Sequence, residues 1–64
     1  MRFDYYYLYL HKFLRDTDNP LAEDKEFIIG RADLAGEEFE TLRRCGTSVA
    51  VAQESAMAVL MDGF

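Results

Sequence analysis

His11 and Cys45 are the two side chains best suited to nucleophilic chemistry, because an imidazole base can activate a thiol to attack an electrophilic substrate. Each is the single residue of its type in the sequence. No orienting group and no glycine-rich oxyanion-hole loop accompanies them along the chain. We therefore expect no catalytic residues and no enzyme, and we expect Cys45 to fill the last turn of a helix as a small hydrophobic side chain.

Acidic residues form the densest charge cluster. Its members are Asp33, Glu37, Glu38 and Glu40. Paired carboxylates can perform acid–base catalysis when burial separates their pKa values. These four positions lie away from the row of apolar residues on the helix expected at residues 21–45. Glu40 precedes Arg44 by one helical turn, which is a favourable spacing for an ion pair. We expect a solvated face, and the spacing excludes an EF-hand loop.

Tyrosines gather near the beginning of the chain, at positions 5, 6, 7 and 9. Such rings occur in cores, at protein interfaces, and on surfaces that stack single-stranded bases. Base stacking requires a basic groove, whereas this chain has a net charge of −5, so we expect no direct binding of nucleic acid. We assign Tyr6 and Tyr7 to the core, and Tyr5 and Tyr9 to an interface.

Arg31 and Asp33 flank Ala32. A charged pair of this kind can lock two helices together near a crossing, or it can be an ordinary surface pair worth less than about 1 kcal/mol. The residues alone favour the surface pair.

The single cysteine indicates the cellular compartment in which the protein is expected. Cys45 has no partner for a disulfide within the chain, and a free cysteine is typical of a reducing environment. There is no cluster of Cys and His with zinc spacing, so we expect no metal and no cofactor. The first residues do not resemble a secretory signal, and no apolar run approaches the ~18 residues of a membrane span. We expect a cytoplasmic protein that does not bind membranes.

The first element spans residues 2–16 and is expected to be a helix. Its apolar residues recur at helical spacing, at Phe3, Tyr6, Tyr7, Leu10, Phe13 and Leu14. The alternative is a strand, because Tyr and Phe favour sheets. The segment lacks alternation of apolar and polar residues, which favours the helix.

The second helix is expected at residues 21–45, after the helix-breaking run that ends at Pro20. Its apolar stripe is Ile28, Ala32, Ala35, Phe39 and Leu42, and Gly46 ends it. Gly30 and Gly36 lie inside this helix, where each costs about 1 kcal/mol relative to Ala. We expect another helix backbone to approach closely at both glycines, with a kink as the alternative.

The third helix is expected at residues 48–61, with Thr47-Ser48 supplying its N-cap. Its stripe is Val49, Ala52, Ala56, Val59 and Leu60, with Met57 and Met61 alongside. Ala52 and Ala56 are small enough to allow close packing against the second helix.

These elements predict an all-α fold, a small three-helix domain that occupies residues 1–64 as a single unit. Half of the residues are hydrophobic, yet a chain of this size buries only about 60% of its unfolded surface. The surplus apolar surface leads us to expect dimerisation, or an unidentified protein partner, to complete the domain. The candidate interface residues are Tyr5, Tyr9, Met57, Met61 and Phe64.

A pattern of packing residues resembles a family of short, uncharacterised all-α bacterial proteins. The matching residues are Phe27, Arg31-Ala32-Asp33, Ala35, Phe39, Gly46, Ala52, Ala56, Leu60 and Gly63. This family occurs in gut-anaerobe genomes, often near genes of conjugative mobile elements, and has no established activity. The resemblance also favours the role of Arg31 and Asp33 as a helix lock.

Relatives in that family continue past the position of Gly63 with a further helical segment. We expect that segment to be absent here, which would leave part of the apolar stripe uncovered.

Two functions follow as hypotheses. The first is a non-catalytic protein-interaction or accessory module, linked to a mobile genetic element. The alternative is an acidic regulator that mimics nucleic acid and occupies the basic cleft of a DNA-handling enzyme, because acids outnumber bases over residues 18–44. A mimic would need carboxylates arrayed along one surface without interspersed bases.

Overall fold

The computed structural model describes residues 4–64, and this part of the chain is helical with no β-strand. Helix α1 spans Asp4–Asp16, the short 3₁₀ helix η1 spans Pro20–Glu23, α2 spans Lys25–Arg44 and α3 spans Val49–Leu60. The predicted all-α fold with three helices is confirmed. The expected contributions of Arg2 and Phe3 to the first helix lie outside the described residues.

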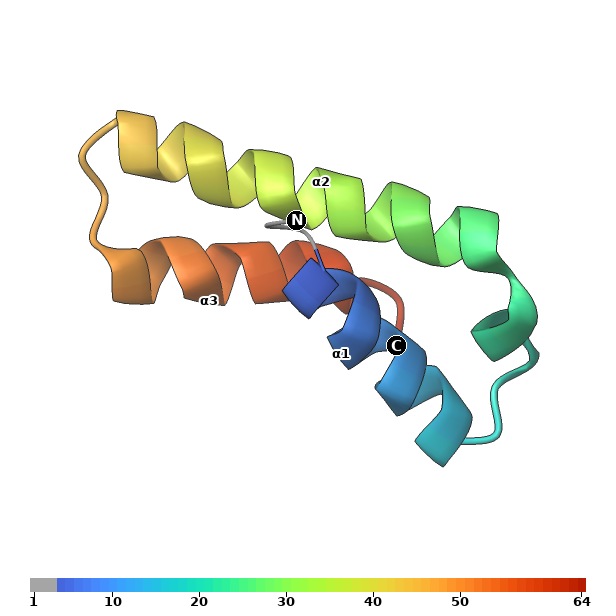
Figure 1. Cartoon of the computed structure of the whole chain (residues 1–64). Coiled ribbons are helices and arrows are strands. Elements are labelled where there is room, and N and C mark those ends of the chain that lie inside the picture. Colours follow the sequence, from blue (N-terminus) through green and yellow to red (C-terminus); the bar gives the residue numbers. More distant parts are fainter. Residues whose placement is uncertain (1–3) are drawn as a thin grey trace.

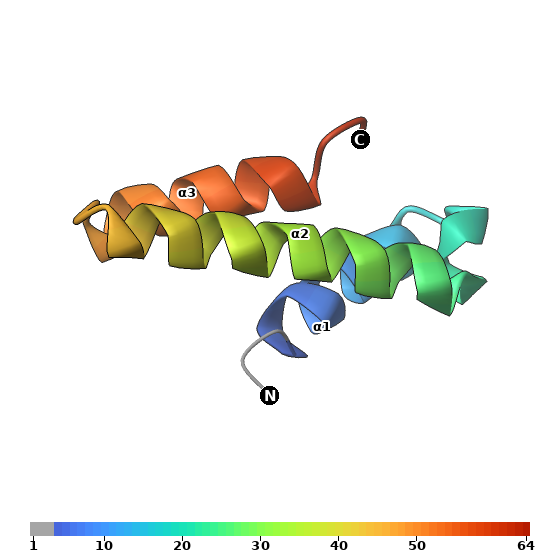
Figure 2. The ribbon, with the colours of Figure 1, turned by 90° about the horizontal axis from the view of Figure 1, so that it is seen from above.

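Helices α2 and α3 form an antiparallel hairpin, and α1 crosses α2 near the open end of that hairpin (Figure 1). Seen from above, α3 runs along one side of α2 and the beginning of α1 lies on the other side (Figure 2). The molecule is elongated, with extents of 37 × 19 × 16 Å.

The core lies where the three helices meet. Its buried side chains are Tyr6, Leu10 and Leu14 from α1, Ile28, Ala32 and Ala35 from α2, and Ala52, Ala56 and Leu60 from α3. All nine belong to the predicted stripes. Alanines dominate the contact between α2 and α3, so these backbones approach closely.

Val49 departs from the prediction, because 56% of its surface is exposed although it lies on the predicted stripe. It begins α3 at the closed end of the hairpin, whereas α1 crosses near the open end (Figure 1).

The predicted beginning of the second helix at residue 21 is wrong. Asp24 has a non-helical backbone (φ −95°, ψ 88°), and its carboxylate accepts a hydrogen bond of 3.1 Å from the amide of Phe27. This N-cap separates η1 from α2. Asn19 caps η1 in the same way, since its Oδ1 accepts from the amide of Leu21 at 2.9 Å.

The end of α2 is a Schellman turn, in which the amide of Gly46 donates to Arg43 and the amide of Thr47 donates to Leu42. Gly46 has a φ of +86°, which favours glycine. Ser48 then caps α3 by accepting from the amide of Val51 at 3.3 Å. Cys45 is the exposed C-cap residue, so the expectation that it fills the last helical turn is wrong.

The two glycines inside α2 have different surroundings. Gly36 is buried, whereas Gly30 is exposed and a Cβ built on it would meet no atom within 4 Å. The expected close approach of another backbone is therefore wrong at Gly30.

Candidate interaction surfaces

His11 and Cys45 do not form a catalytic pair. The imidazole of His11 lies beside η1 and its ring centroid is 5.9 Å from that of Tyr7. Cys45 follows the last residue of α2, whose 20 residues begin just after η1 and span about 30 Å. The two side chains are thus at opposite ends of α2.

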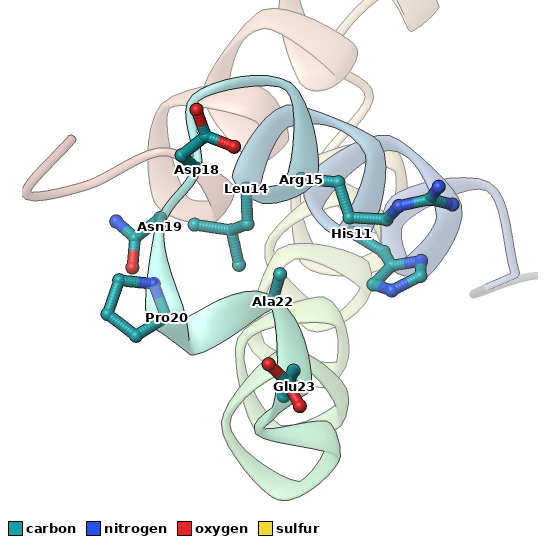
Figure 3. A pocket seen from close by; sticks show the side chains of 8 residues that line it. All are labelled: His11, Leu14, Arg15, Asp18, Asn19, Pro20, Ala22 and Glu23. Carbon is teal, nitrogen blue, oxygen red and sulfur yellow. The ribbon is translucent and has the colours of Figure 1, made fainter.

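A depression of ≈ 590 Å³ lies between the end of α1 and η1. Its lining residues are His11, Leu14, Arg15, Asp18, Asn19, Pro20, Ala22 and Glu23. His11 and Arg15 lie on one side and Asp18 and Pro20 on the other, with Leu14 between them (Figure 3).

This depression mixes two acidic and two potentially basic side chains, so its charge selects no class of ligand. The carbonyl oxygen of the Asn19 side chain is already used to cap η1. Over residues 4–64 no three His, Cys, Asp or Glu side chains are grouped so that they could hold a metal ion. We assign this depression no chemistry.

Arg31 locks the hairpin by reaching from α2 to the C-terminal end of α3. One guanidinium nitrogen donates to the backbone carbonyls of Asp62 at 2.7 Å, Val59 at 3.3 Å and Leu60 at 3.4 Å. A cation at this position complements the negative end of the helix dipole.

The contact that Arg31 makes differs from the predicted pair between Arg31 and Asp33. The hydrogen-bond partners of Arg31 are backbone carbonyl oxygens, and Asp33 is exposed. The reason is geometric, because side chains two residues apart on a helix do not face each other.

Aromatic rings enclose the Arg31 guanidinium. Its central carbon lies 5.1 Å from the ring centroid of Phe27 and 5.8 Å from that of Phe64, within the range of cation–π attraction. The ring of Phe64 also contacts Phe13 and Phe27, with centroid distances of 5.9 and 6.0 Å. Phe64 remains 44% exposed.

Met57 and Met61, two more of the predicted interface residues, are half-buried against the core. Together with Phe64, they are therefore in contact with their own chain, which leaves less of their surface free for a partner.

Tyr5 and Tyr9 lie on an exposed side of α1. With Leu8 they form the outer α1 face, on which Tyr5 is 54%, Leu8 62% and Tyr9 44% exposed. The spacing places all three on one side of α1, and the rings of Tyr5 and Tyr9 are 6.2 Å apart. The following turn carries Lys12, whose ammonium pairs with Asp16 at 2.7 Å.

The opposite side of α1 faces the core through Tyr6. Its hydroxyl donates to Oε1 of Gln53 on α3 at 2.8 Å. Burial, and secondarily the charge of Tyr5, raises the pKa of the Tyr6 phenol. Tyr6 was predicted to be a core residue, but no pattern in the sequence indicated Gln53 as its partner.

A second surface, the α2–α3 groove, lies between the two hairpin helices and has a volume of ≈ 470 Å³. Its lining residues are Arg31, Leu34, Glu38, Ser55, Ala58, Val59 and Asp62. Leu34 is 54% exposed, and Val51, one turn before Ser55 on α3, is 51% exposed. Neither residue is among the predicted interface residues, because the groove forms only when α2 and α3 pair.

Residues 1–64 match a family described as a domain of unknown function, DUF1896. The chain belongs to the DUF1896 family. This confirms the predicted resemblance to an uncharacterised family. No curated protein and no solved structure matches this DUF1896 chain.

The acidic residues of the DUF1896 chain have different environments. Asp33 and Glu37 are exposed, as expected for a solvated face, whereas Glu38 is half-buried and lines the α2–α3 groove. The predicted pair between Glu40 and Arg44 stays a prediction.

No helix over residues 4–64 is both long and apolar enough to cross a lipid bilayer.

Proposed function

We propose that this DUF1896 chain is a non-catalytic protein-interaction module that dimerises through the outer α1 face. The observation that carries the proposal is the exposure of Tyr5, Leu8 and Tyr9 on a helix whose other side already faces the core. The first turns of α1 are thus apolar on both sides, which is typical of a helix covered on both sides.

The chemistry of this face suits protein contact. Tyrosine is enriched at interfaces because its ring is apolar while its hydroxyl tolerates water. Each Å² of apolar surface that is removed from water on binding contributes about 25 cal/mol to the favourable free energy of association. Tyr5 and Tyr9 already lie against each other, so they lose little side-chain freedom when a partner binds.

A second copy of the chain is a suitable partner, because a two-fold contact brings the same face of each protomer together. The charges beside this face are balanced by the Lys12–Asp16 pair, so two copies do not repel each other locally. Three side chains supply only part of the roughly 800 Å² per partner found in stable interfaces. We therefore expect a reversible dimer with micromolar affinity.

Single-cysteine cross-linking tests this proposal. In a Cys45→Ser background, Leu8→Cys should form a disulfide-linked dimer under mild oxidation at high micromolar concentration, because a two-fold contact centred on Leu8 places that residue opposite its own copy. The disulfide is covalent, so it traps the contact even though loss of the leucine weakens the reversible dimer. Ile29→Cys is the matched control, since Ile29 is 50% exposed on α2. Equal cross-linking of the two variants, or none in either, would reject the dimer.

We further propose an accessory role in a conjugative mobile element, within the cytoplasm. The packing residues shared with the family support the genetic context, and the single exposed cysteine supports a reducing compartment. Deleting the coding sequence from such an element should lower its transfer frequency. An unchanged frequency would remove this part of the proposal.

The alternative, an acidic mimic of nucleic acid, has one observation in its favour. Glu26, Asp33 and Glu37 are exposed and helical spacing places them on the same side of α2. Arg44 follows two turns later on that side, which makes this acidic row short beside the continuous phosphates of a DNA strand. We therefore rank the mimic second.

A further inference from the structure

We propose that the α2–α3 groove binds a basic amphipathic helix from another protein. The proposal rests on the role of this chain as an interaction module, but it uses a surface separate from the outer α1 face. It also names the chemistry of the partner, which carries aliphatic side chains on one side and lysine or arginine along the flanks.

The shape of the groove suits a helix. Ser55 and Ala58 have small side chains on the α3 side, so a third helix can approach to the 8–10 Å interaxial distance that is typical of packed helices. Leu34 lines the groove and is 54% exposed, so it provides an apolar contact. Val51 is 51% exposed one turn before Ser55, and its helical spacing continues the α3 side of the groove. Hydrophobic anchors spaced three or four residues apart on the incoming helix would meet them.

The length of the groove limits the partner. After α2, its lining residues run from Ser55 on α3 to Asp62, just beyond the end of that helix, and this stretch spans roughly 10 Å at about 1.5 Å per residue. Two turns of a partner helix therefore cover the groove.

The charge around the groove favours a basic partner. Glu38 and Asp62 line it, and Glu37 and Glu54 are exposed one turn from Leu34 and Ala58 respectively. The one cationic lining residue, Arg31, already donates to three carbonyl oxygens of its own chain.

A second copy of this chain is a poorer occupant. The exposed apolar helix face that a second copy offers is the outer α1 face, and the lysine beside that face is already paired with Asp16. A foreign helix with unpaired lysines or arginines matches the groove better.

Binding of two designed peptides tests the proposal. One peptide is a labelled three-turn helix with leucines at i, i+3, i+4 and i+7 and lysines elsewhere, and the other carries glutamates in place of the lysines. Fluorescence anisotropy with the full chain should show saturable binding of the leucine–lysine peptide and no binding of the leucine–glutamate peptide. Absence of binding by the lysine peptide would overturn the proposal.

Matched variants distinguish the groove from general attraction between opposite charges. Glu38→Lys and Leu34→Ser should each weaken peptide binding about tenfold, equivalent to about 1.4 kcal/mol. Asp33→Lys makes the same charge change off the groove, and Ile29→Ser removes a similarly exposed aliphatic side chain from another side of α2. These controls should change the affinity less than twofold. Equal weakening by a groove variant and its control would overturn the proposal.

The oligomeric state of the same variants separates this proposal from the dimer. Leu34→Ser should leave dimerisation unchanged while it weakens peptide binding. If Leu34→Ser abolishes the dimer, the groove is itself the contact between copies and the proposal is wrong. If the chain is monomeric yet binds the lysine peptide in the groove, only the dimer is rejected.

Discussion

At the residue scale, Arg31 is the side chain that ties the two helices of the hairpin together at its open end. Its guanidinium joins α2 to the last carbonyls of α3 and is enclosed by Phe27 and Phe64. We expect Arg31→Ala to lower the free energy of unfolding by about 1.5–3 kcal/mol, the usual loss for hydrogen bonds to a charged group. Urea denaturation followed by circular dichroism measures this value.

Arg44→Ala is the matched control for that experiment, because Arg44 is exposed in the last turn of α2. Its effect should stay within about 0.5 kcal/mol, as is typical of surface substitutions. If both variants unfold at the same urea concentration, Arg31 does not lock the hairpin.

Tyr6 predicts how the stability of the fold depends on pH. Burial raises the pKa of its phenol above the usual value of about 10. Because the folded state favours the protonated phenol, its contribution to stability is complete below about pH 10 and is lost as the pH rises through the higher folded-state pKa. Thermal unfolding from pH 8 to pH 11 should therefore show a loss of stability for the native chain above pH 10.

Tyr6→Phe separates this group from the other tyrosines. It should lower stability by about 0.5–1.5 kcal/mol at neutral pH, since the bond to Gln53 is removed, and it should show a smaller alkaline loss than the native chain. Tyr9→Phe should alter neither property, because the Tyr9 ring is 44% exposed. If Tyr6→Phe loses as much stability above pH 10 as the native chain does, the loss does not come from the Tyr6 phenol.

At the scale of the elements, a glycine inside α2 and a glycine just beyond its end predict opposite effects of the same substitution. Gly30 lies inside the helix with open space where a Cβ would stand, so Gly30→Ala should stabilise the protein by about 0.5–1 kcal/mol. Gly46 has a φ of +86°, and Gly46→Ala should destabilise it by about 1–2 kcal/mol. Thermal melts of the two variants should shift in opposite directions, and a shift in the same direction would contradict these backbone assignments.

The helices were predictable from the sequence because their stripes are regular. Ile28, Ala32 and Ala35 have the predicted spacing and are buried. The beginning of α2 was not predictable from the stripe, since Pro20 and Asp24 can each begin a helix and the local hydrogen bond from Phe27 to Asp24 decides between them. The end at Gly46 was predictable because a left-handed C-cap requires glycine.

At the scale of the whole molecule, the two proposed surfaces differ in how far the sequence predicted them. Tyr5 and Tyr9 lie off the stripe of a single helix, so the outer α1 face followed from one segment. The α2–α3 groove combines Leu34 with Ala58 and Val59, which are far apart in the sequence. That surface exists only after α2 and α3 pair, so no periodicity within one helix could indicate it.

The central claim is that the outer α1 face holds two copies of the chain together, and molar mass from light scattering tests it most directly. Over a hundredfold dilution from high micromolar concentration, the native chain should fall from near twice its 7.4 kDa mass towards that mass. Leu8→Ser should remain at 7.4 kDa throughout, since it removes the most exposed apolar side chain of this face. A native chain that is monomeric at every concentration, or a Leu8→Ser variant that dimerises like the native chain, would contradict the claim.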